Sequence, residues 1–596
     1  MSKIFKVPDL QNKPSRSGFD LGFKNSFSAK VGELLPIGHR TLMVGDKIKL
    51  QIQHRTVTLP LESSAFTRFT EYFDFFFVPY DQLYRQTPQI LTQMQQNPQY
   101  AQSPSSPAPV GTALPWFEIR DFIRPVLSSQ ADAERPFLYH LHSSSTSPLP
   151  TEYNLNYQGF GLGYEALKLW NYLGGTYTPE SFFTAIDDSS FKAPTNRPCS
   201  ALPFAAYQKI YFDYYRFQQW ENNAPQCYNF DYLSADAKIT RAMLQQMDVQ
   251  SNLFTLRHCN YPKDLFFGIL PSSQFGETAA VNIQFNPDNS GVSSNDRFSA
   301  TVQSGSGGMA NIQTQLDGAS AGSPVAGDLQ FDILQLRQKK ALQRYREVIG
   351  TGNQDYKSMV KKIFGEDVPE YTAHTVRYLG GFRSNIEIST VVNNALGSET
   401  AEPTMKGIGQ GTDEQNHPIK FTAKEPGIVM CIYRVMPLLD YALDAPHFDL
   451  MKTEVDDFAN PFFDRLGLQE LPLMYLDDRN YANSLGDDFL GYVPRYFDYK
   501  TSIDVVNGFF RTNMRHWVSV YDHDFFMKFF TPDPSLSTGG QVQINKDFFK
   551  VNAHLCDDIF FQEVNQSVDT DQFAINCNIS FDAVRNLDYK GLPTNN

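Results

Sequence analysis

The sequence lacks most of the patterns that carry catalysis or direct a chain into a membrane. It has six cysteines in 596 residues, and none of them form a C-x-x-C pair. A chain this long does not depend on disulfides, so we expect reduced thiols in a protein assembled in the cytoplasm. The start has no apolar signal core, and no apolar run approaches the ~18 residues of a membrane span. Neither signal-directed secretion nor membrane insertion is therefore expected.

Catalytic and cofactor motifs are also missing. The sequence has no G-x-S-x-G elbow, phosphate-binding loop or zinc-ribbon spacing. Two clusters of histidine and aspartate, at 522–524 and 554–558, lack the spacing of known metal-ligand motifs, and such loop residues usually face solvent. The glycines within 159–163 have no preceding strand, so they predict a tight turn rather than a dinucleotide site. No catalytic residue, cofactor or metal ligand is predicted.

Charge is unevenly distributed. The chain carries −14 from 51 basic and 65 acidic residues, which argues against a surface wrapped everywhere in nucleic acid but allows one basic face. Residues 1–30 hold six basic and two acidic side chains, a local charge of +4, and the predicted helices at 331–349 and 355–364 hold a second basic cluster. Solvated termini and helix faces explain most such clusters. The candidates for DNA contact are Lys3, Lys6, Lys13, Arg16, Lys339, Lys340 and Arg344.

Aromatic residues are abundant, with 49 Phe and 30 Tyr. They suit a large core or, for Tyr especially, surfaces that become buried against a partner. The segment 71–80 places Phe73, Phe75 and Phe77 on one side of an extended chain and mainly aromatic or branched residues on the other, which predicts a strand covered on both faces. Upstream, 47–53 alternates apolar and polar residues, which predicts a strand with one wet face.

Strand patterns near both ends, separated by long helical and irregular stretches, suggest one β core with insertions. The other predicted elements are helices at 81–96 (broken at Pro88), 164–170, 202–220, 331–349 and 355–364, and strands at 427–435, 542–544, 548–551 and 573–581. This arrangement predicts a mainly β fold, a single eight-stranded antiparallel jelly-roll β-sandwich with large helical and loop insertions.

The predicted domain organisation is an arm followed by one domain. It comprises an extended amino-terminal arm at 1–40, able to lie along neighbouring subunits, and a jelly-roll domain at 41–596 with a loop and helix insertion at 81–200, a helical segment at 201–276, an exposed excursion at 277–330, a helical hairpin at 331–365 and a return to the β core at 425–596. The excursion is rich in Gly, Ser, Asn and Gln and cannot build a core. It is either a linker or a loop held at both ends, and the alternation at 281–285 favours the loop.

Ordered short motifs resemble one protein family. They are SGFDL at 17–21, GELLP at 32–36, FFFVP at 75–79, LPFAAY at 202–207, the segment 261–271, the helix from Leu336 to Glu347, YLGG at 378–381, LGY at 490–492, RY at 495–496, YK at 499–500, GFFR at 508–511 and Trp517. In this order they are similar to the major capsid protein of the Microviridae, small icosahedral phages with single-stranded DNA. The similarity is to the gokushovirus-like branch, including phages of Bacteroidetes. The loops near 100–160 and 277–330 do not contribute to it.

The resemblance implies a jelly roll whose copies form a T=1 icosahedral shell around circular single-stranded DNA. The expected location is the virion capsid, and the expected partners are other copies of the chain, a small basic DNA-packaging protein, a DNA pilot protein, the genome and a host surface receptor. In gokushovirus-like members an insertion at the position of 277–330 clusters at threefold axes and is thought to contact the host. Candidate host-facing residues are Asn286, Asn289, Asn295, Gln303 and Gln313, and the proline-rich loops at 101–115 and 143–150 compete for this role.

Two other classes of protein stay open. The carboxylate pairs of glycoside hydrolases are set by tertiary geometry, so a carbohydrate-binding or glycan-hydrolysing β-sandwich protein is the alternative. A secreted adhesin is a third option, which the missing signal disfavours.

Overall fold

The computed structural model describes the chain in segments. They are 15–61, 66–92, 113–118, 164–175, 198–233, 236–240, 243, 253–276, 284–287, 297–303, 309–315, 327–330, 333–392, 405–415, 417–443, 445–476, 488–522, 529–531, 541–552, 556, 559–560 and 571–590. The chain forms two compact units. The first comprises Met1–Pro271 and Asp355–Asn596, and the second comprises Ser272–Gln354.

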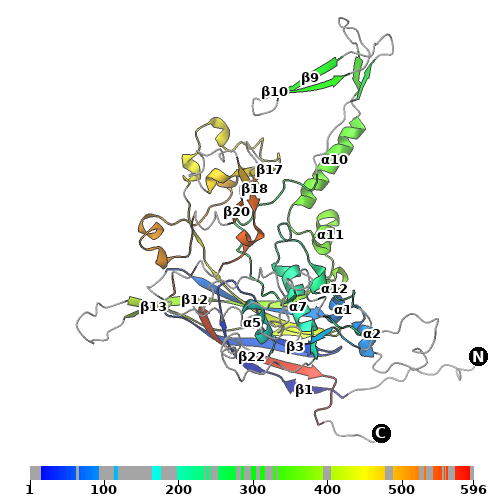
Figure 1. The fold of residues 1–596 in the computed structure, drawn as a ribbon, viewed down its shortest axis with the longest axis vertical. Coiled ribbons are helices and arrows are strands. Elements are labelled where there is room, and N and C mark those ends of the chain that lie inside the picture. The colour runs from blue at the N-terminus through cyan, green and yellow to red at the C-terminus, as the bar shows by residue number, and fades with distance from the viewer. Residues whose placement is uncertain are drawn as a thin grey trace, which may run out of the picture. The chain divides into compact units, whose positions relative to one another are not determined.

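The first unit is built on one antiparallel sheet of ten strands (Figure 1). The strands are β1 (Ser17–Asp20), β2 (Phe23–Ala29), β3 (Leu35–Leu42), β4 (Lys47–Thr58), β5 (Phe69–Pro79), β12 (Arg377–Val392), β13 (Met405–Glu414), β14 (Ile419–Thr422), β15 (Gly427–Pro437) and β22 (Phe573–Arg585). Their order is β1-β22-β4-β13-β12-β5-β15-β3, with β2 also paired to β22 and β14 to β4. The mainly β fold is confirmed. The sheet has more strands than the predicted eight because short β1 and β14 pair alongside longer strands.

Hydrophobic patterning decides which side of each strand is buried. In β4, Ile48, Leu50 and Ile52 are buried while Lys47 and Lys49 are exposed, as the alternation predicts. β5 lies between β12 and β15 and is buried on both sides along most of its length, which is also as predicted. β15 and β22 match the strands predicted at 427–435 and 573–581.

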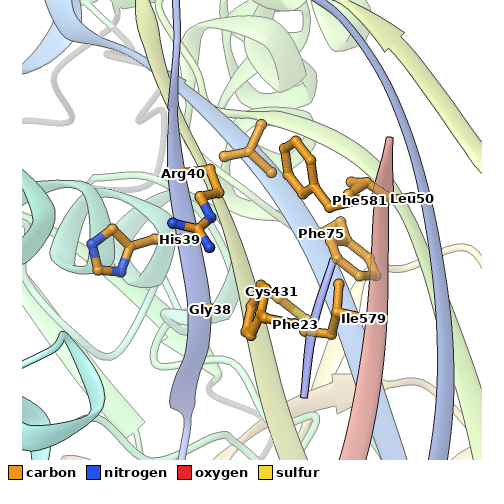
Figure 2. Close-up of a pocket in the computed structure, with 10 residues that line it drawn as sticks. Phe23, Gly38, His39, Arg40, Leu50, Phe75, Cys431, Ile579 and Phe581 are labelled. Carbon is orange, nitrogen blue, oxygen red and sulfur yellow. The ribbon is translucent and has the colours of Figure 1, made fainter. Parts of the chain in front are cut away.

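The sheet curls until its two ends approach each other. β2 and β3 are not neighbours in the hydrogen-bonded order, yet Asn25 Nδ2 donates to the carbonyl of Ile37 at 2.6 Å. Figure 2 shows the small apolar pocket at this seam, lined by Phe23 of β2, Gly38 of β3 and Ile579 of β22. A Cβ atom on Gly38 would lie 2.6 Å from the Phe23 ring, so a larger residue would push the seam apart. The curled sheet thereby forms the two layers of a β-sandwich.

A buried carboxylate links the two layers. Glu71 on β5 is fully buried and accepts hydrogen bonds from Thr56 Oγ1 at 2.6 Å and from the Tyr433 hydroxyl at 3.0 Å. Its other oxygen lies 2.6 Å from Nε2 of buried His54. Burial, followed by the nearby Glu71 charge, raises the pKa of Tyr433, so the phenol stays protonated and can donate. Both carboxylate oxygens of Glu71 are thereby paired in an otherwise aromatic core, whereas Nδ1 of His54 has no hydrogen-bond partner among the described residues.

Helices cover the sheet at β3, β5 and β15. α1 (Tyr80–Leu83) and α2 (Thr87–Thr92) follow β5, α5 (Tyr164–Tyr172) contacts β3, and α7 (Leu202–Ile210) contacts β5 and β15 (Figure 1). The broken helix predicted at 81–96 is confirmed up to Thr92, although the break precedes Pro88, and residues 93–96 lie outside the described residues. That proline lies in the first turn of α2, where its missing N–H removes no helical hydrogen bond.

The helix predicted at 202–220 ends early, at Ile210. A π-helical turn, η2 (Tyr211–Tyr215), follows, and the N–H of Arg216 donates to the carbonyl of Tyr211 at 2.9 Å. Tyr214 and Tyr215 of this turn pack against Phe76 of β5, and the Tyr215 hydroxyl donates to Asp74 at 2.8 Å. Tertiary contacts therefore replace the last turns of the predicted helix.

The rest of the first unit consists of short elements. They are β6 (Trp116–Glu118), β7 (Pro198–Ser200), η3 (Pro225–Cys227), α11 (Tyr356–Phe364), α12 (Glu370–Ala373), β16 (Asp440–Ala442), η4 (Phe448–Leu450), η5 (Val455–Asp457), β17 (Leu468–Pro472), η6 (Leu473–Tyr475), β18 (Phe489–Pro494), η8 (Phe497–Tyr499), η9 (Gly508–Arg511), η10 (Arg515–Trp517), β19 (Val520–Asp522), β20 (Phe530–Thr531), β21 (Gln543–Ile544) and η11 (Lys546–Phe549). The strand predicted at 548–551 is wrong. Asn545 caps a 3₁₀ turn there by accepting from the N–H of Asp547 at 3.1 Å.

The predicted amino-terminal arm is extended, but the described part of it is not free. From Ser17 onward it forms β1, β2 and β3, which pair within the sheet of their own chain. The physical reason is the alternation of Phe23 and Phe27 with polar residues, which gives β2 one half-buried face. Residues 1–14, most of the loop at 101–115 and all of the loop at 143–150 lie outside the described residues.

The second unit contains the predicted excursion. β8 (Gln284–Pro287) pairs with β11 (Gly327–Gln330), and β9 (Arg297–Gln303) pairs with β10 (Met309–Gln315), both antiparallel. α10 (Ile333–Gly350) follows and confirms the helix predicted at 331–349. The described strands show that the excursion has its own paired structure, as its alternation suggests.

Candidate assembly surface

The described surface of the first unit exposes many large apolar side chains, most densely between residues 448 and 466. We call this segment the aromatic lobe. Its exposed members are Leu450, Val455, Phe458, Phe462, Phe463 and Leu466. Phe462 is 91% exposed and Val455 88% exposed, so the fold of one chain leaves them almost entirely in water.

Short capped turns hold the backbone of the aromatic lobe. The Asp457 carboxylate accepts from the N–H groups of Glu454 and Thr453, both at 2.8 Å, and these bonds lower the pKa of Asp457. One turn further on, Asn460 Oδ1 accepts from the N–H of Phe462 at 3.1 Å. Polar side chains thus satisfy the backbone while the apolar side chains point outward.

A lysine anchors the lobe to the following segment. Lys452 Nζ lies 2.8 Å from the carboxylate of Asp498 and 3.0 Å from that of Asp449, and 4.0 Å from the centroid of the Tyr499 ring. The hydrogen bond to Asp498 is the main cause that raises the pKa of Lys452, so its charge persists at neutral pH. The anchor fixes the lobe against η8.

Aromatic packing supports the lobe from below. Phe448, Tyr475 and Phe497 form three edge-to-face pairs with ring centroids 5.2 to 5.6 Å apart. Phe448 and Phe497 are buried. A packed base under exposed rings makes a preformed platform, and an exposed apolar patch of this kind marks an interaction surface.

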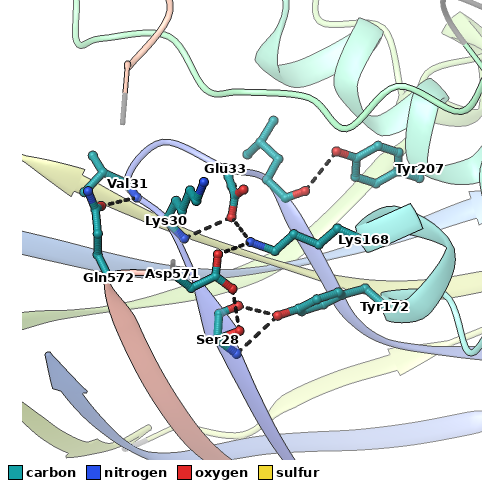
Figure 3. A network of polar contacts seen from close by, with 10 residues as sticks. Ser28, Lys30, Val31, Glu33, Lys168, Tyr172, Tyr207, Asp571 and Gln572 are labelled. Atoms are coloured by element: carbon teal, nitrogen blue, oxygen red, sulfur yellow. Dashed lines mark hydrogen bonds and ion pairs between the residues drawn. The ribbon is translucent and has the colours of Figure 1, made fainter. Parts of the chain in front are cut away.

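A polar clamp positions the insertion that carries α5 (Figure 3). Lys168 Nζ lies 2.6 Å from Glu33 and 2.8 Å from Asp571, and the exposed fractions of the three side chains are 3%, 3% and 9%. The same Glu33 oxygen accepts from the N–H of Lys30 at 2.9 Å. The clamp therefore joins α5, the turn between β2 and β3, and the residue that leads into β22.

A second buried network positions η2 against η11. Lys550 Nζ lies 3.1 Å from Glu221, and the Tyr211 hydroxyl donates to the same oxygen at 2.5 Å. Burial alone would raise the pKa of Glu221, but the charge of Lys550 and the hydrogen bond from Tyr211 outweigh it and lower the pKa. Burial lowers the pKa of Lys550.

The structure distributes the predicted DNA-contact residues over both units. Those outside the described residues are Lys3, Lys6 and Lys13. Arg16 is exposed beside β1, and its Nε donates to Asn586 Oδ1 at 2.7 Å. The other three lie on α10 in the second unit, with Lys340 and Arg344 exposed and Lys339 half-buried. DNA contact by these residues stays a prediction.

The predicted host-facing residues belong to the second unit. Asn286 lies on β8, Gln303 on β9 and Gln313 on β10. Asn289 and Asn295 lie outside the described residues. Host contact by this set also stays a prediction.

The described residues contain neither a cluster of metal-binding side chains nor a membrane-spanning helix. Among them, no three His, Cys, Asp or Glu side chains form a group that could hold a metal ion. Of the histidine and aspartate residues in the clusters at 522–524 and 554–558, only Asp522 lies within the described residues. No helix in the described part of the chain has the length and apolar character needed to cross a bilayer.

The sequence patterns did not identify the aromatic lobe. Val455, Phe458, Phe462 and Leu466 follow a nearly helical spacing, but Pro461 interrupts it, and short capped turns present these side chains in place of a helix. The available signal was the run Pro461, Phe462 and Phe463 among turn-forming Asn and Asp residues. No sequence pattern indicated the polar clamp, because Lys168 is 135 residues from Glu33 and 403 residues from Asp571 in the chain.

Comparison with models of protein families identifies a family that covers most of the chain. Residues 181–593 match a family model described as Capsid protein (F protein). No curated protein matches the chain. The matched region includes the aromatic lobe, α7, the second unit and β22.

Proposed function

The chain belongs to the capsid protein (F protein) family, the major capsid proteins of the Microviridae, and from this membership we propose that its copies form a T=1 icosahedral shell around circular single-stranded DNA. Membership makes the chain a structural protein of the virion capsid. The shell geometry, the enclosed genome and the contact with a host are parts of the proposal.

The observation that carries the proposal is the aromatic lobe. A shell subunit must keep apolar area exposed until it meets a neighbour, and obligate interfaces bury on the order of 2,000 Å² or more. The lobe presents such side chains on a supported backbone, with Phe462 91% exposed. A lobe that contacts a neighbouring copy removes these side chains from water, which supplies the driving force for assembly.

The charge of the chain bears on how the genome would be held. A net charge of −14 does not suit a shell that neutralises DNA by itself. We therefore include a small basic DNA-packaging protein and a DNA pilot protein among the proposed partners. DNA contact by the shell protein is expected to be independent of sequence and to weaken as salt is raised.

The second unit is the proposed host-contact element. Its paired strands β8 to β11 occupy the excursion predicted at 277–330. Replacing residues 284–330 with a short Gly-Ser linker should leave particle assembly intact and reduce adsorption to host cells. Failure of that variant to assemble would contradict this part of the proposal.

Electron microscopy of the purified protein tests the function directly. Closed shells of one diameter are expected, with DNA inside that resists nuclease until the shell is opened. A protein that remains monomeric at high concentration, with no particles under any salt condition, would refute the proposal.

A further inference from the structure

The two outward sides of the curled sheet differ in their covering. Over β5 and β15, aromatic residues of η2 lie against the sheet; for example, the rings of Phe76 and Tyr214 have centroids 5.0 Å apart. Over β2, β22 and β4, the outward side chains alternate as exposed residues along each strand. In the described part of the chain, other elements thus cover one half of the outward sheet surface, and the side chains of the other half are exposed. We call this exposed half the bare half.

The bare half is polar throughout most of its area. Its exposed or half-exposed outward residues are Asp20 on β1; Lys24, Ser26 and Ser28 on β2; Ala574, Asn576, Asn578, Ser580, Asp582 and Val584 on β22; Lys47, Lys49, Gln51, Gln53, Arg55 and Val57 on β4; Gln410, Thr412 and Glu414 on β13; and Lys420 and Thr422 on β14. We call this set the polar face. The strand register aligns its members in rows, such as Lys24 with Asn578 and Gln53, or Asn576 with Arg55 and Thr412.

The charge of the polar face is opposite to that of the chain. It carries five basic side chains against Asp20, Asp582 and Glu414, a local charge of +2, whereas the whole chain carries −14. Lys49 and Asp582 are 4.0 Å apart and about half exposed, so their pairing is weak and leaves the lysine available. Lys49 also lies opposite Lys420 in the ladder, which concentrates positive charge at this end of the sheet.

These features suit a strand of nucleic acid better than a protein neighbour. Interfaces between capsid subunits need a large apolar area, which the aromatic lobe has, whereas the apolar side chains of the polar face are limited to Val57, Ala574 and Val584. Lysine and arginine contact phosphates, while rows of amide and hydroxyl groups offer donors and acceptors to unpaired bases. Basic side chains on such a surface can hold the phosphate backbone of single-stranded nucleic acid without reading its sequence.

From this charge complementarity we propose that the polar face binds the single-stranded DNA genome. The inference rests on the proposed function and names the surface that the genome contacts. The basic residues of α10, in the second unit, are not part of the surface.

The test compares two charge-neutralised triple variants of the full-length chain. One carries Lys49→Gln, Arg55→Gln and Lys420→Gln on the polar face. The matched control carries Lys339→Gln, Lys340→Gln and Arg344→Gln on α10. Binding of a fluorescein-labelled oligothymidylate is measured by anisotropy across a salt series. A third variant, with Lys49→Arg, Arg55→Lys and Lys420→Arg, keeps the charge.

Loss of three phosphate contacts should make the slope of log K against log salt shallower by about 2. When salt is lowered from 1 M to 0.1 M, the affinity of the polar-face variant should therefore rise roughly 100-fold less than that of the wild type. The charge-keeping variant should bind as the wild type does, and the α10 variant, which removes a competing set of candidate DNA contacts, should lose much less affinity than the polar-face variant. All three polar-face residues are at the surface, so melting temperature and particle assembly should not change. Equal binding by the polar-face variant and the wild type, or a loss confined to the α10 variant, would overturn the proposal.

The same measurements separate this inference from the proposed function. If wild-type particles contain no DNA and wild-type protein does not bind the oligonucleotide, the genome-enclosing function fails. If the wild type binds and packages DNA but the polar-face variant does so equally well, only the assignment of the surface fails.

Discussion

Replacing Phe462 with serine should block assembly without unfolding the subunit. The side chain is 91% exposed, so its removal leaves no cavity in the isolated chain. The backbone there is held by Asn460, whose side chain accepts from the N–H of residue 462, and serine keeps that N–H. The melting temperature of the unassembled protein should therefore stay within a few degrees of the wild type.

The expected effect on assembly follows from the area of the ring. A phenylalanine side chain buries roughly 150 Å² or more, which at about 25 cal/mol per Å² corresponds to about 4 kcal/mol for each copy. Allowing for the Cβ that serine keeps, about 3 kcal/mol is lost at each contact. At 1.4 kcal/mol for each factor of ten, the concentration needed for assembly should rise roughly 100-fold.

Light scattering against protein concentration measures this threshold, and electron microscopy identifies the product. Phe364→Ser on α11 is the matched control, since that ring is 73% exposed but lies outside the aromatic lobe. Phe448→Ser, at the buried base of the lobe, should instead lower the melting temperature. Particles formed by Phe462→Ser at the wild-type threshold would refute the assignment of the lobe to a subunit interface.

Three further predictions concern the fold of the subunit. Burial raises the pKa of Cys199 to about 11, so alkylation at pH 8 should be slow in native protein and fast in denaturant; rapid native labelling would contradict the packing described. Lys168→Met should cost about 3 to 5 kcal/mol in the free energy of unfolding measured by denaturant titration, and adding Glu33→Gln should restore part of it, because the single change leaves buried carboxylates unpaired. Because Lys550 helps to hold the pKa of Glu221 below its unfolded value, the pair should stabilise the fold above about pH 4.5 and lose that contribution as pH falls through the folded pKa. In the Glu221→Gln variant, the melting temperature should fall less steeply as the pH is lowered below about 4.5. An unchanged decrease in melting temperature would argue against the network.

The β core could be predicted from the sequence because its strands carry strong local patterns. The alternation in β4 and the aromatic run in β5 each indicate a strand without reference to the rest of the chain. The order in which the strands pair could not be predicted from local patterns. For example, β22 pairs with β4 although more than five hundred residues separate them in the chain. The amino-terminal strands were expected to be an arm for the same reason, because their partner is at the other end of the chain.

The functional surfaces were less predictable than the core. The basic cluster in the sequence predicted DNA contacts on α10. The polar face could not be predicted in the same way, because its residues are brought together only by the register of β2, β4 and β22. The aromatic lobe depends on capped turns, whose geometry hydrophobic periodicity does not report. The early end of α7 has a similar cause, since contacts such as that of Tyr215 with Asp74 override local helix preference.

A density map of the assembled particle at side-chain resolution tests the central claim most directly. The account predicts that Phe462 and Val455 are buried against a neighbouring copy of the chain. A map in which the aromatic lobe faces solvent, while other surfaces form every contact between subunits, would contradict it.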